Sequence, residues 1–258
     1  MPARDLPLLI EAARAAGEVA MRYAGESAVR WDKPEGAGPV TEADIAVNDL
    51  LEQELRGARG DYGWLSEESA DDGARLSRER VFIIDPIDGT RSFIEGSNTW
   101  AHSIAVAEKG KVTAAVIYMP KRGKLYAAAA GEGATLNNAP IRVGVETRLA
   151  RATVLAARPA TEQKHWKGGH VPAFQRAYRP SLAYRLGLVA EGRFDAMMTL
   201  RRSWEWDIAA GDLILREAGA VTSDQAGQGL IFNNPDPRLN GVLAANPALH
   251  RQIAHALS

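Results

Sequence analysis

The sequence predicts a mixed α/β (α+β) fold in which helices and sheets form layers, with mixed and antiparallel strands in the sheets. Amphipathic helical stretches alternate with short apolar runs along the chain. The run at 81–84 is apolar throughout, which is typical of a strand covered on both faces. Runs at 102–108, 112–119 and 124–130 are joined by turns too short for a parallel crossover, so we expect antiparallel pairing.

The first elements of the chain are helices. Residues 6–24 repeat apolar side chains at helical spacing and predict a helix. Residues 25–40 are polar and rich in Gly and Pro, so we interpret them as a mobile loop. Thr41 can cap the next helix, and Asp44 stands three residues on, where an acid can complete a capping box. We expect this second helix to end near 57–60.

The second half of the chain alternates more quickly between element types. The polar segment 158–180, with two glycines at its middle, predicts a long loop or a surface insertion. We expect a helix at 181–192, a strand at 194–200 and a helix at 207–218, which ends before a stop signal at Gly219. The remaining predicted elements are short strands near 220–223, 230–232 and 242–245 and a last helix at 247–257.

Composition excludes several classes of protein. Of the 258 residues, 46% are hydrophobic and 24% are charged, which argues against disorder and fibrous repeats. Because 31 basic residues face 32 acidic ones, bulk charge indicates neither a nucleic-acid nor a membrane-surface partner. The lack of Cys excludes disulfides, thiolate zinc sites and a Cys nucleophile, and it fits a reducing cytoplasm. The sequence contains no apolar run of roughly 18–20 residues for a membrane span and no signal-peptide core, so we expect a cytoplasmic protein.

Two carboxylates follow the apolar strand at 81–84 directly. Asp85 and Asp88 are three residues apart, and the Gly89-Thr90 step after them predicts a sharp turn into a short helix. Both acids then project from a strand end, where the free N–H groups of a helix start also point. Paired carboxylates suit a hard cation such as magnesium, and the N–H groups suit a phosphate. The alternative is that these acids only cap the helix.

Further acids stand at comparable positions. Glu67 and Glu68 follow an apolar pair that predicts another strand end. Asp207 opens the helix at 207–218, and Asp44 belongs to the capping box. Taken alone, each acid is explained by a solvated loop or a helix cap. Together they predict a metal-assisted phosphoryl-transfer site, and the sequence has no G-x-S-x-G elbow, H-E-x-x-H helix, P-loop or G-x-G-x-x-G turn that would indicate another chemistry.

The segment Asp85-Pro86-Ile87-Asp88-Gly89-Thr90 resembles the core motif of the inositol monophosphatase superfamily. It is preceded by Val40-Thr41-Glu42-Ala43-Asp44 and Ser66-Glu67-Glu68-Ser69, and it is followed by Trp206-Asp207-Ile208-Ala209-Ala210-Gly211. Since these blocks occur in the superfamily's order, the resemblance spans almost the whole chain. It implies a magnesium-dependent, lithium-sensitive phosphomonoesterase with a layered αβαβα sandwich, acting on a small-molecule phosphate ester.

The resemblance also implies the metal ligands. One magnesium ion would be held by Glu67, Asp85 and the backbone carbonyl of Ile87. A second ion would be held by Asp85, Asp88 and Asp207, so that Asp85 bridges the pair. A third, weaker ion would lean on Glu67, which makes two to three ions in total.

Roles in catalysis follow from the same resemblance. Gly89 and Thr90 would offer backbone N–H groups to the phosphate. Thr90, tied to Asp44, would help Glu67 to orient and deprotonate a water. Lys33 lies in a segment where relatives carry a basic residue near the active site.

Within the superfamily, two substrate branches compete. The Glu205-Trp206-Asp207 sequence is similar to that of CysQ-type 3′(2′),5′-bisphosphate nucleotidases, which act on 3′-phosphoadenosine 5′-phosphate. Arg185 stands where that branch carries Lys, and a cation there would bind the second phosphate. We therefore expect Arg185, Glu205 and Lys33 to contact substrate. Arg201 and Arg202 are interpreted as a solvated strand end, with ligand contact as the alternative. Inositol-1-monophosphatase is the alternative activity.

Two further expectations concern the whole chain. We expect a first sub-domain at 1–145 that carries most ligands and a second at 146–258 that completes the metal site and the substrate pocket. The resemblance allows a monomer or a homodimer. Because some superfamily members bind the transcription or ribosome machinery, a regulatory binding role is kept as an alternative from another class.

Overall fold

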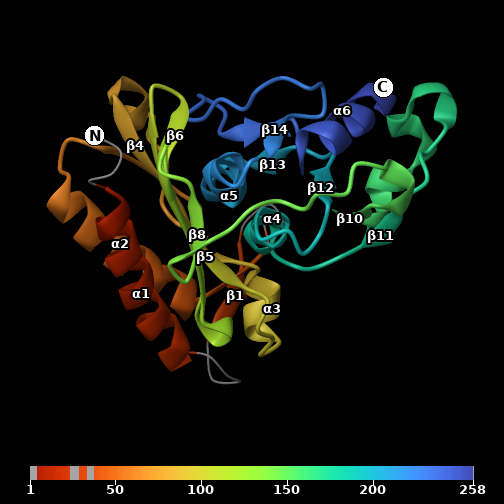
Figure 1. Cartoon of the computed structure of the whole chain (residues 1–258). Coiled ribbons are helices and arrows are strands. Elements are labelled where there is room, and N and C mark those ends of the chain that lie inside the picture. Colours follow the sequence, from red (N-terminus) through yellow and green to blue (C-terminus); the bar gives the residue numbers. More distant parts are fainter. Residues whose placement is uncertain (1–4, 24–28, 34–37, 258) are drawn as a thin grey trace.

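Layers of helices and sheets stack side by side in the computed structural model, which describes residues 5–23, 29–33 and 38–257 (Figure 1). Helices α1 and α2 cover one face of a seven-stranded sheet, and α4 and α5 lie against its other face. A five-stranded sheet follows, and α6 packs on the far side of it. This order is helix, sheet, helix, sheet, helix, so the predicted αβαβα sandwich is confirmed.

The first two helices pack on the large sheet through apolar stripes. Helix α1 (Leu6–Tyr23) buries mostly alanines, which allow close packing, and it confirms the predicted helix up to residue 23. Residue 24 lies outside the described ranges. Helix α2 (Glu42–Ala58) begins after Thr41, and the capping box predicted with Asp44 is present.

The predicted loop at 25–40 is partly wrong. Strands β1 (Arg30–Asp32) and β2 (Pro39–Thr41) pair in an antiparallel ladder. Short exposed strands with Gly and Pro between them carry no periodic signal, so the sequence could not distinguish them from a loop. The predicted loop residues 25–28 and 34–37 lie outside the described ranges.

The large sheet is antiparallel except for one pair. Strands β3 and β4 run parallel, and every later neighbour pairs antiparallel. The apolar run 81–84 and the three predicted runs after it are confirmed as strands of this sheet. The strands, in spatial order, are β3 (Gly63–Ser66), β4 (Arg80–Asp88), β5 (Ala101–Glu108), β6 (Lys111–Met119), β7 (Lys124–Ala129), β8 (Ala134–Leu136) and β9 (Ala139–Pro140).

The second sheet is mixed. Its strands, in spatial order, are β11 (Gln175–Ala177), β10 (Thr153–Ala156), β12 (Ala196–Thr199), β16 (Val242–Ala245) and β14 (Val221–Ser223). Strand β11 lies inside the segment 158–180, where the sequence indicated only irregular structure, because it adds to the sheet edge beside β10 without a pattern of its own. The predicted strand at 230–232 is wrong, and a two-residue strand, β15 (Arg238–Leu239), instead pairs with β13 (Ser203–Trp204).

Four further α-helices complete the described part of the fold. Their bounds are α3 (Thr90–Ile94), α4 (Leu182–Ala190), α5 (Glu205–Glu217) and α6 (Pro247–Ala256). Helix α5 begins two residues before the predicted start, so Asp207 lies inside its first turn and is not the cap. None of the helices in the described part of the chain is long and apolar enough to cross a membrane.

The largest apolar core joins the two halves of the chain. One buried cluster contains residues of β4, β5 and β6 together with residues of α4, α5 and β12. A separate cluster lies under α1 and α2, and a third lies under α6. Because α4 and α5 share a core with the large sheet, the starts of these two helices lie at the end of β4, beside Asp85 and Asp88.

Candidate active site

Asp85 and Asp88 lie where β4 leaves its regular ladder. The pairing of β4 with β5 shifts register between these two residues, and Pro86 stands between them. Asp85 is almost completely buried, and its Oδ1 atom has no hydrogen-bond partner. Asp88 Oδ2 accepts hydrogen bonds from Ser181 Oγ at 2.7 Å and from the Ala183 N–H at 2.5 Å. The start of α4 therefore holds one oxygen of Asp88.

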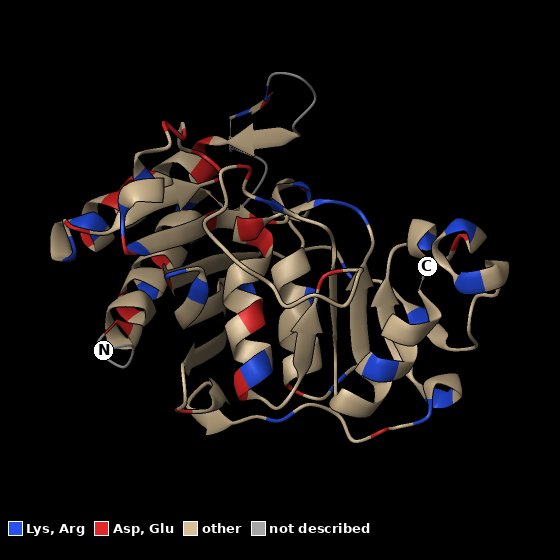
Figure 2. Ribbon diagram, turned by 90° about the horizontal axis from the view of Figure 1, so that it is seen from above, with Lys and Arg blue, Asp and Glu red and all other residues tan. Residues whose placement is uncertain are grey.

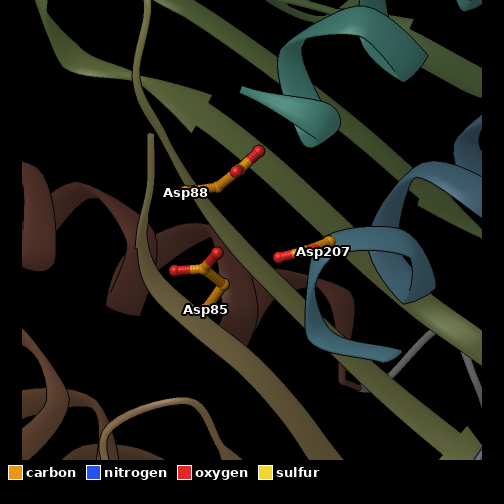
Figure 3. Close-up of side chains that lie close together, drawn as sticks. All are labelled: Asp85, Asp88 and Asp207. Atoms are coloured by element: carbon orange, nitrogen blue, oxygen red, sulfur yellow. The ribbon is translucent and has the colours of Figure 1, made fainter. Parts of the chain in front are cut away.

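Asp207 approaches the same point from the first turn of α5. One carboxylate oxygen each of Asp85, Asp88 and Asp207 lies within 4.8 Å of the others (Figure 3). The three side chains come from both halves of the chain and lie close together, with Asp207 pointing toward Asp85. We call these residues the acid triad. The sequence predicted this convergence.

The electrostatics of the acid triad call for a cation. Burial raises the pKa of Asp85, Asp88 and Asp207, and for Asp85 and Asp207 the neighbouring carboxylates raise the pKa further. A buried carboxylate oxygen without a donor is rare in folded proteins, because it loses its hydration without compensation. A divalent cation with oxygen ligands would satisfy Asp85 Oδ1 and neutralise the repulsion. The residues present therefore fit a hard divalent ion.

Glu67, the fourth predicted carboxylate ligand, follows strand β3 and lines the cavity above the acid triad. Its Oε1 atom accepts a hydrogen bond from Lys33 Nζ at 2.8 Å, and Lys33 also contacts Glu68 Oε1 at 2.7 Å. Burial raises the pKa of Glu68 to about 7. Lys33 thus lies beside the acids and does not line the cavity, and its predicted contact with substrate stays a prediction.

Thr90 is held by a chain of hydrogen bonds that starts in α2. Its Oγ1 atom lies 3.2 Å from Asp44 Oδ1 and 3.2 Å from the Ile87 carbonyl oxygen. Asp44 accepts further hydrogen bonds from the Thr41 N–H and hydroxyl, at 2.8 and 2.6 Å. Burial raises the pKa of Asp44 to about 6. The structure therefore brings the predicted pair Thr90 and Asp44 together.

Gly89 makes the sharp turn between β4 and α3 possible. Its φ of +99° lies in the left-handed region, which a side chain rarely adopts. A Cβ there would lie 3.2 Å from Ser181 Cβ and 3.3 Å from the Thr99 carbonyl oxygen. Gly89 and Thr90 both line the cavity, beside N–H groups that the first turn of a helix leaves without intrahelical partners.

The acid triad opens into a cavity of about 400 Å³ with basic and aromatic walls. Arg185 lines it, is only 7% exposed, and donates a hydrogen bond from Nε to the Ser181 carbonyl oxygen at 3.3 Å. Trp204 and Trp206 also line it, and their rings stack with centroids 4.6 Å apart. The Arg238 guanidinium lies over the Trp204 ring at 5.1 Å. Trp204 stays exposed while Trp206 is buried, so the stacked pair forms an aromatic wall of the cavity.

The prediction that Glu205 contacts substrate is wrong. Its side chain is fully buried on the other side of α5 and does not line the cavity. Its carboxylate accepts hydrogen bonds from the Asn233 N–H at 2.6 Å and from the Asn234 N–H and side-chain amide at 2.9 and 2.7 Å. Because residues two apart on a helix face different directions, Glu205 fixes the loop at 233–234 while Asp207 faces the acid triad.

Sequence reasoning missed three residues of the site. Ser181 bridges Asp88 and the start of α4, since it also accepts a hydrogen bond from the Tyr184 N–H at 3.1 Å. Its place as the first residue of the predicted helix at 181–192, where serine often caps, was the available signal. His102 on β5 lies against the Pro86 carbonyl oxygen, and burial lowers its pKa to about 4, so the neutral ring holds the turn between the two aspartates. Tyr178, which also lines the cavity, has no signal in its polar segment.

Fold and site together define a class of protein. An αβαβα sandwich that brings carboxylates from two sub-structures together beside a helix start, under a cavity with basic walls, is the architecture of a phosphomonoester hydrolase.

Comparison with known proteins agrees. The inositol monophosphatase family matches residues 3–258, so the chain belongs to this family. The chain is 33% identical over 266 residues to inositol-1-monophosphatase of Mesorhizobium japonicum, covering 98% of this chain and 95% of the relative. It is 32% identical over 261 residues to histidinol-phosphatase of Chlorobaculum parvum, with 98% and 96% covered.

Two further proteins extend the comparison. Nus factor SuhB of Escherichia coli is 32% identical over 231 residues, with 86% of this chain and 85% of the relative covered. The inositol monophosphatase (IMPase) structure of Thermotoga maritima superposes with a TM-score of 0.82 at 26% identity, covering 99% of this chain and 96% of that one. The family named from the sequence motifs is thereby confirmed.

Proposed function

We propose that the protein is a magnesium-dependent 3′(2′),5′-bisphosphate nucleotidase that releases the 3′-phosphate of 3′-phosphoadenosine 5′-phosphate. The observation that carries the substrate is Arg185, a nearly buried cation in the cavity of the acid triad. A bisphosphate brings a second anionic group that can pair with this guanidinium through two parallel hydrogen bonds. Inositol 1-phosphate has only hydroxyl groups to offer there.

The proposed ligands follow the geometry of the acids. Asp85, Asp88 and Asp207 would hold one ion, and Glu67, Asp85 and the Ile87 carbonyl another, with a third ion near Glu67. When bound, such ions lower the pKa of a water and neutralise the charge that develops on the leaving oxygen. The number of ions and inhibition by lithium belong to this proposal.

The chain's own groups would orient the reaction. Thr90 Oγ1, held by Asp44 Oδ1, lies beside the cavity and would fix the water that Glu67 deprotonates. The N–H groups of Gly89 and Thr90 would bind the phosphate oxygens and stabilise their negative charge. Water would then attack phosphorus in line, so no covalent phosphoenzyme is required.

A side-by-side rate comparison tests the substrate. With magnesium present, we expect kcat/KM for 3′-phosphoadenosine 5′-phosphate to exceed that for inositol 1-phosphate and for histidinol phosphate. The relatives' names make these two the appropriate competitors. A higher kcat/KM for inositol 1-phosphate would replace the nucleotidase with the alternative, an inositol-1-monophosphatase.

A regulatory role is the second candidate, supported by the relative that is named a Nus factor. The intact set of acids argues that such binding would accompany catalysis and not replace it. Purified protein that bound RNA polymerase but hydrolysed none of the three esters with magnesium present would favour this candidate over the enzyme.

A further inference from the structure

A second cavity, of about 480 Å³, adjoins the cavity of the acid triad. The two cavities share the side chains of Arg91, Tyr178, Arg185 and Arg201 as a common boundary. The outer wall of the second cavity comes from the segment 157–165, at the start of the irregular insertion. Neither the family's core motifs nor the proposed catalytic residues include this wall.

The second cavity is basic. Arg91, Lys164, Arg185 and Arg201 line it, and none of its lining residues is acidic. Lys164 also pairs with Glu162 at 2.6 Å, with both side chains largely exposed. Residues 151–180 together carry six Lys or Arg and a single acid, and blue segments prevail around the C-terminus in Figure 2. An excess of positive charge around a cavity favours an anionic ligand.

The boundary between the two cavities is an aromatic–cation pair. The Arg185 guanidinium lies over the Tyr178 ring at 5.4 Å, and Tyr178 is half exposed. Arg185 is fixed at Ser181, the same residue that donates to Asp88. A ligand whose phosphate lies at the acid triad can therefore extend past Tyr178 into the second cavity and stay close to basic side chains.

We propose that the second cavity binds the second anionic group of the substrate, so that the insertion selects phosphate esters that carry a second phosphate. This inference rests on the proposed phosphomonoesterase function of the cleft and gives the second phosphate a definite location. Tyr178 would contact the part of the substrate that joins the two phosphates. Arg185 would pair with the second phosphate from the boundary of the two cavities, and Arg201 and Lys164 would contact it from the second cavity.

Adjacent arginines provide a matched test. Arg201 lines both cavities, whereas Arg202 pairs with Asp236 at 2.6 Å on the surface and lines neither. The measured quantity is the ratio of kcat/KM for 3′-phosphoadenosine 5′-phosphate to that for adenosine 3′-phosphate, which lacks the second phosphate. Because one charge-assisted contact is lost, we expect Arg201→Met to lower this ratio by about tenfold. Arg202→Met should leave the ratio unchanged.

Two lysines of the insertion provide a second test variant with its matched control. Lys164→Met should lower the same ratio by about threefold, less than Arg201→Met, because Lys164 is largely exposed. Lys167 lines neither cavity and donates to the His255 carbonyl oxygen at 2.8 Å, so Lys167→Met is the control for loss of charge alone. Equal changes in both lysine variants, or equal losses for both substrates, would overturn the proposal.

Two measurements separate this inference from the nucleotidase proposal. If nucleotides are not hydrolysed, the ratio is measured for inositol 1,4-bisphosphate against inositol 1-phosphate. A fall in that ratio in Arg201→Met alone would support the second-phosphate cavity while the nucleotidase fails. Calorimetry in EDTA measures how tightly adenosine 5′-phosphate binds when no metal ion is present, so that its phosphate can occupy the second cavity alone. We expect weaker binding by Arg201→Met than by Arg202→Met. Equal binding by the two variants would contradict the inference.

Discussion

Two aspartates on one helix show how the neighbouring groups decide what a residue does. Asp212 of α5 pairs with Arg216 at 3.0 Å and accepts a hydrogen bond from Thr222 Oγ1 at 2.5 Å, so its charge is compensated within the protein. Asp207, five residues earlier, lies beside the carboxylates of Asp85 and Asp88. Asp212 therefore stabilises the fold, whereas Asp207 requires a cation from outside the chain.

Asp207→Asn is therefore expected to remove activity and keep the fold. The amide has almost the same shape but lacks the charge that would hold a metal ion, so kcat should fall by about 100-fold or more. Phosphate release with magnesium gives kcat, and circular dichroism reports the fold. Asp212→Asn is the matched control and should lower thermal stability while keeping at least half of the activity. If the two variants lost activity equally, the metal-site assignment would be wrong.

At the scale of residues, the sequence predicted the acid triad. It did not predict which residues adjacent in the sequence also line the cavity. The core motif and the Trp206-Asp207 block were sufficient to select Asp85, Asp88 and Asp207. Glu205 was assigned to substrate because the Glu205-Trp206-Asp207 sequence resembles that of the CysQ type. Such a resemblance does not say which face of α5 each residue occupies, and a helix turns by about 100° per residue.

Packing between α4 and α5 positions the site at the scale of elements. Helix α4 contributes Arg185 and the N–H group that holds Asp88, and α5 contributes Asp207. At Gly211 the two helices approach so closely that a Cβ would lie 2.4 Å from Leu186 Cδ1 and 2.6 Å from Leu186 Cβ. Because Leu186 Cβ cannot move away independently, the spacing of the helices depends on this glycine.

Gly211→Ala is expected to destabilise the protein by about 1–3 kcal/mol, the usual cost of overpacking a core. Urea unfolding followed by circular dichroism measures this change. Gly57→Ala on α2 is the control, because no atom lies within 4 Å of the added Cβ and alanine should stabilise that helix by about 0.5 kcal/mol. An unchanged midpoint for Gly211→Ala would show that the helices can separate without cost.

Elements with their own periodic pattern were predicted well, and elements that depend on a neighbour were not. The helices and the antiparallel strands of the large sheet carry local signals of length, spacing and turns. Strand β11 exists only because β10 offers an edge, and the β1–β2 ladder is short and exposed. The outer wall of the second cavity comes from the segment 157–165, which carries no periodic pattern, so the sequence indicated nothing about this cavity.

At the scale of the whole molecule, the site lowers the stability of the metal-free protein. Burial raises the pKa of Asp44 to about 6 and of Glu68 to about 7, and it also raises the pKa of all three acids of the triad. These acids then bind more protons in the folded chain than in the unfolded chain between about pH 4 and 7. Their contribution to stability therefore falls as the pH rises through that window. His102 and His250 have lowered pKa values and act in the opposite direction below about pH 6.5.

The effect of magnesium on the melting temperature distinguishes the contribution of the acids to the pH dependence of stability from that of the histidines. The ion binds the ionised carboxylates, so the gain in melting temperature on adding magnesium should be small at pH 5 and grow up to about pH 7.5. The histidines contribute equally with and without the ion, and their effect cancels in this difference. Differential scanning calorimetry at fixed ionic strength measures it, and Asp207→Asn should show much less gain at every pH. A gain that was independent of pH, or unchanged in Asp207→Asn, would mean that magnesium binds elsewhere on the molecule.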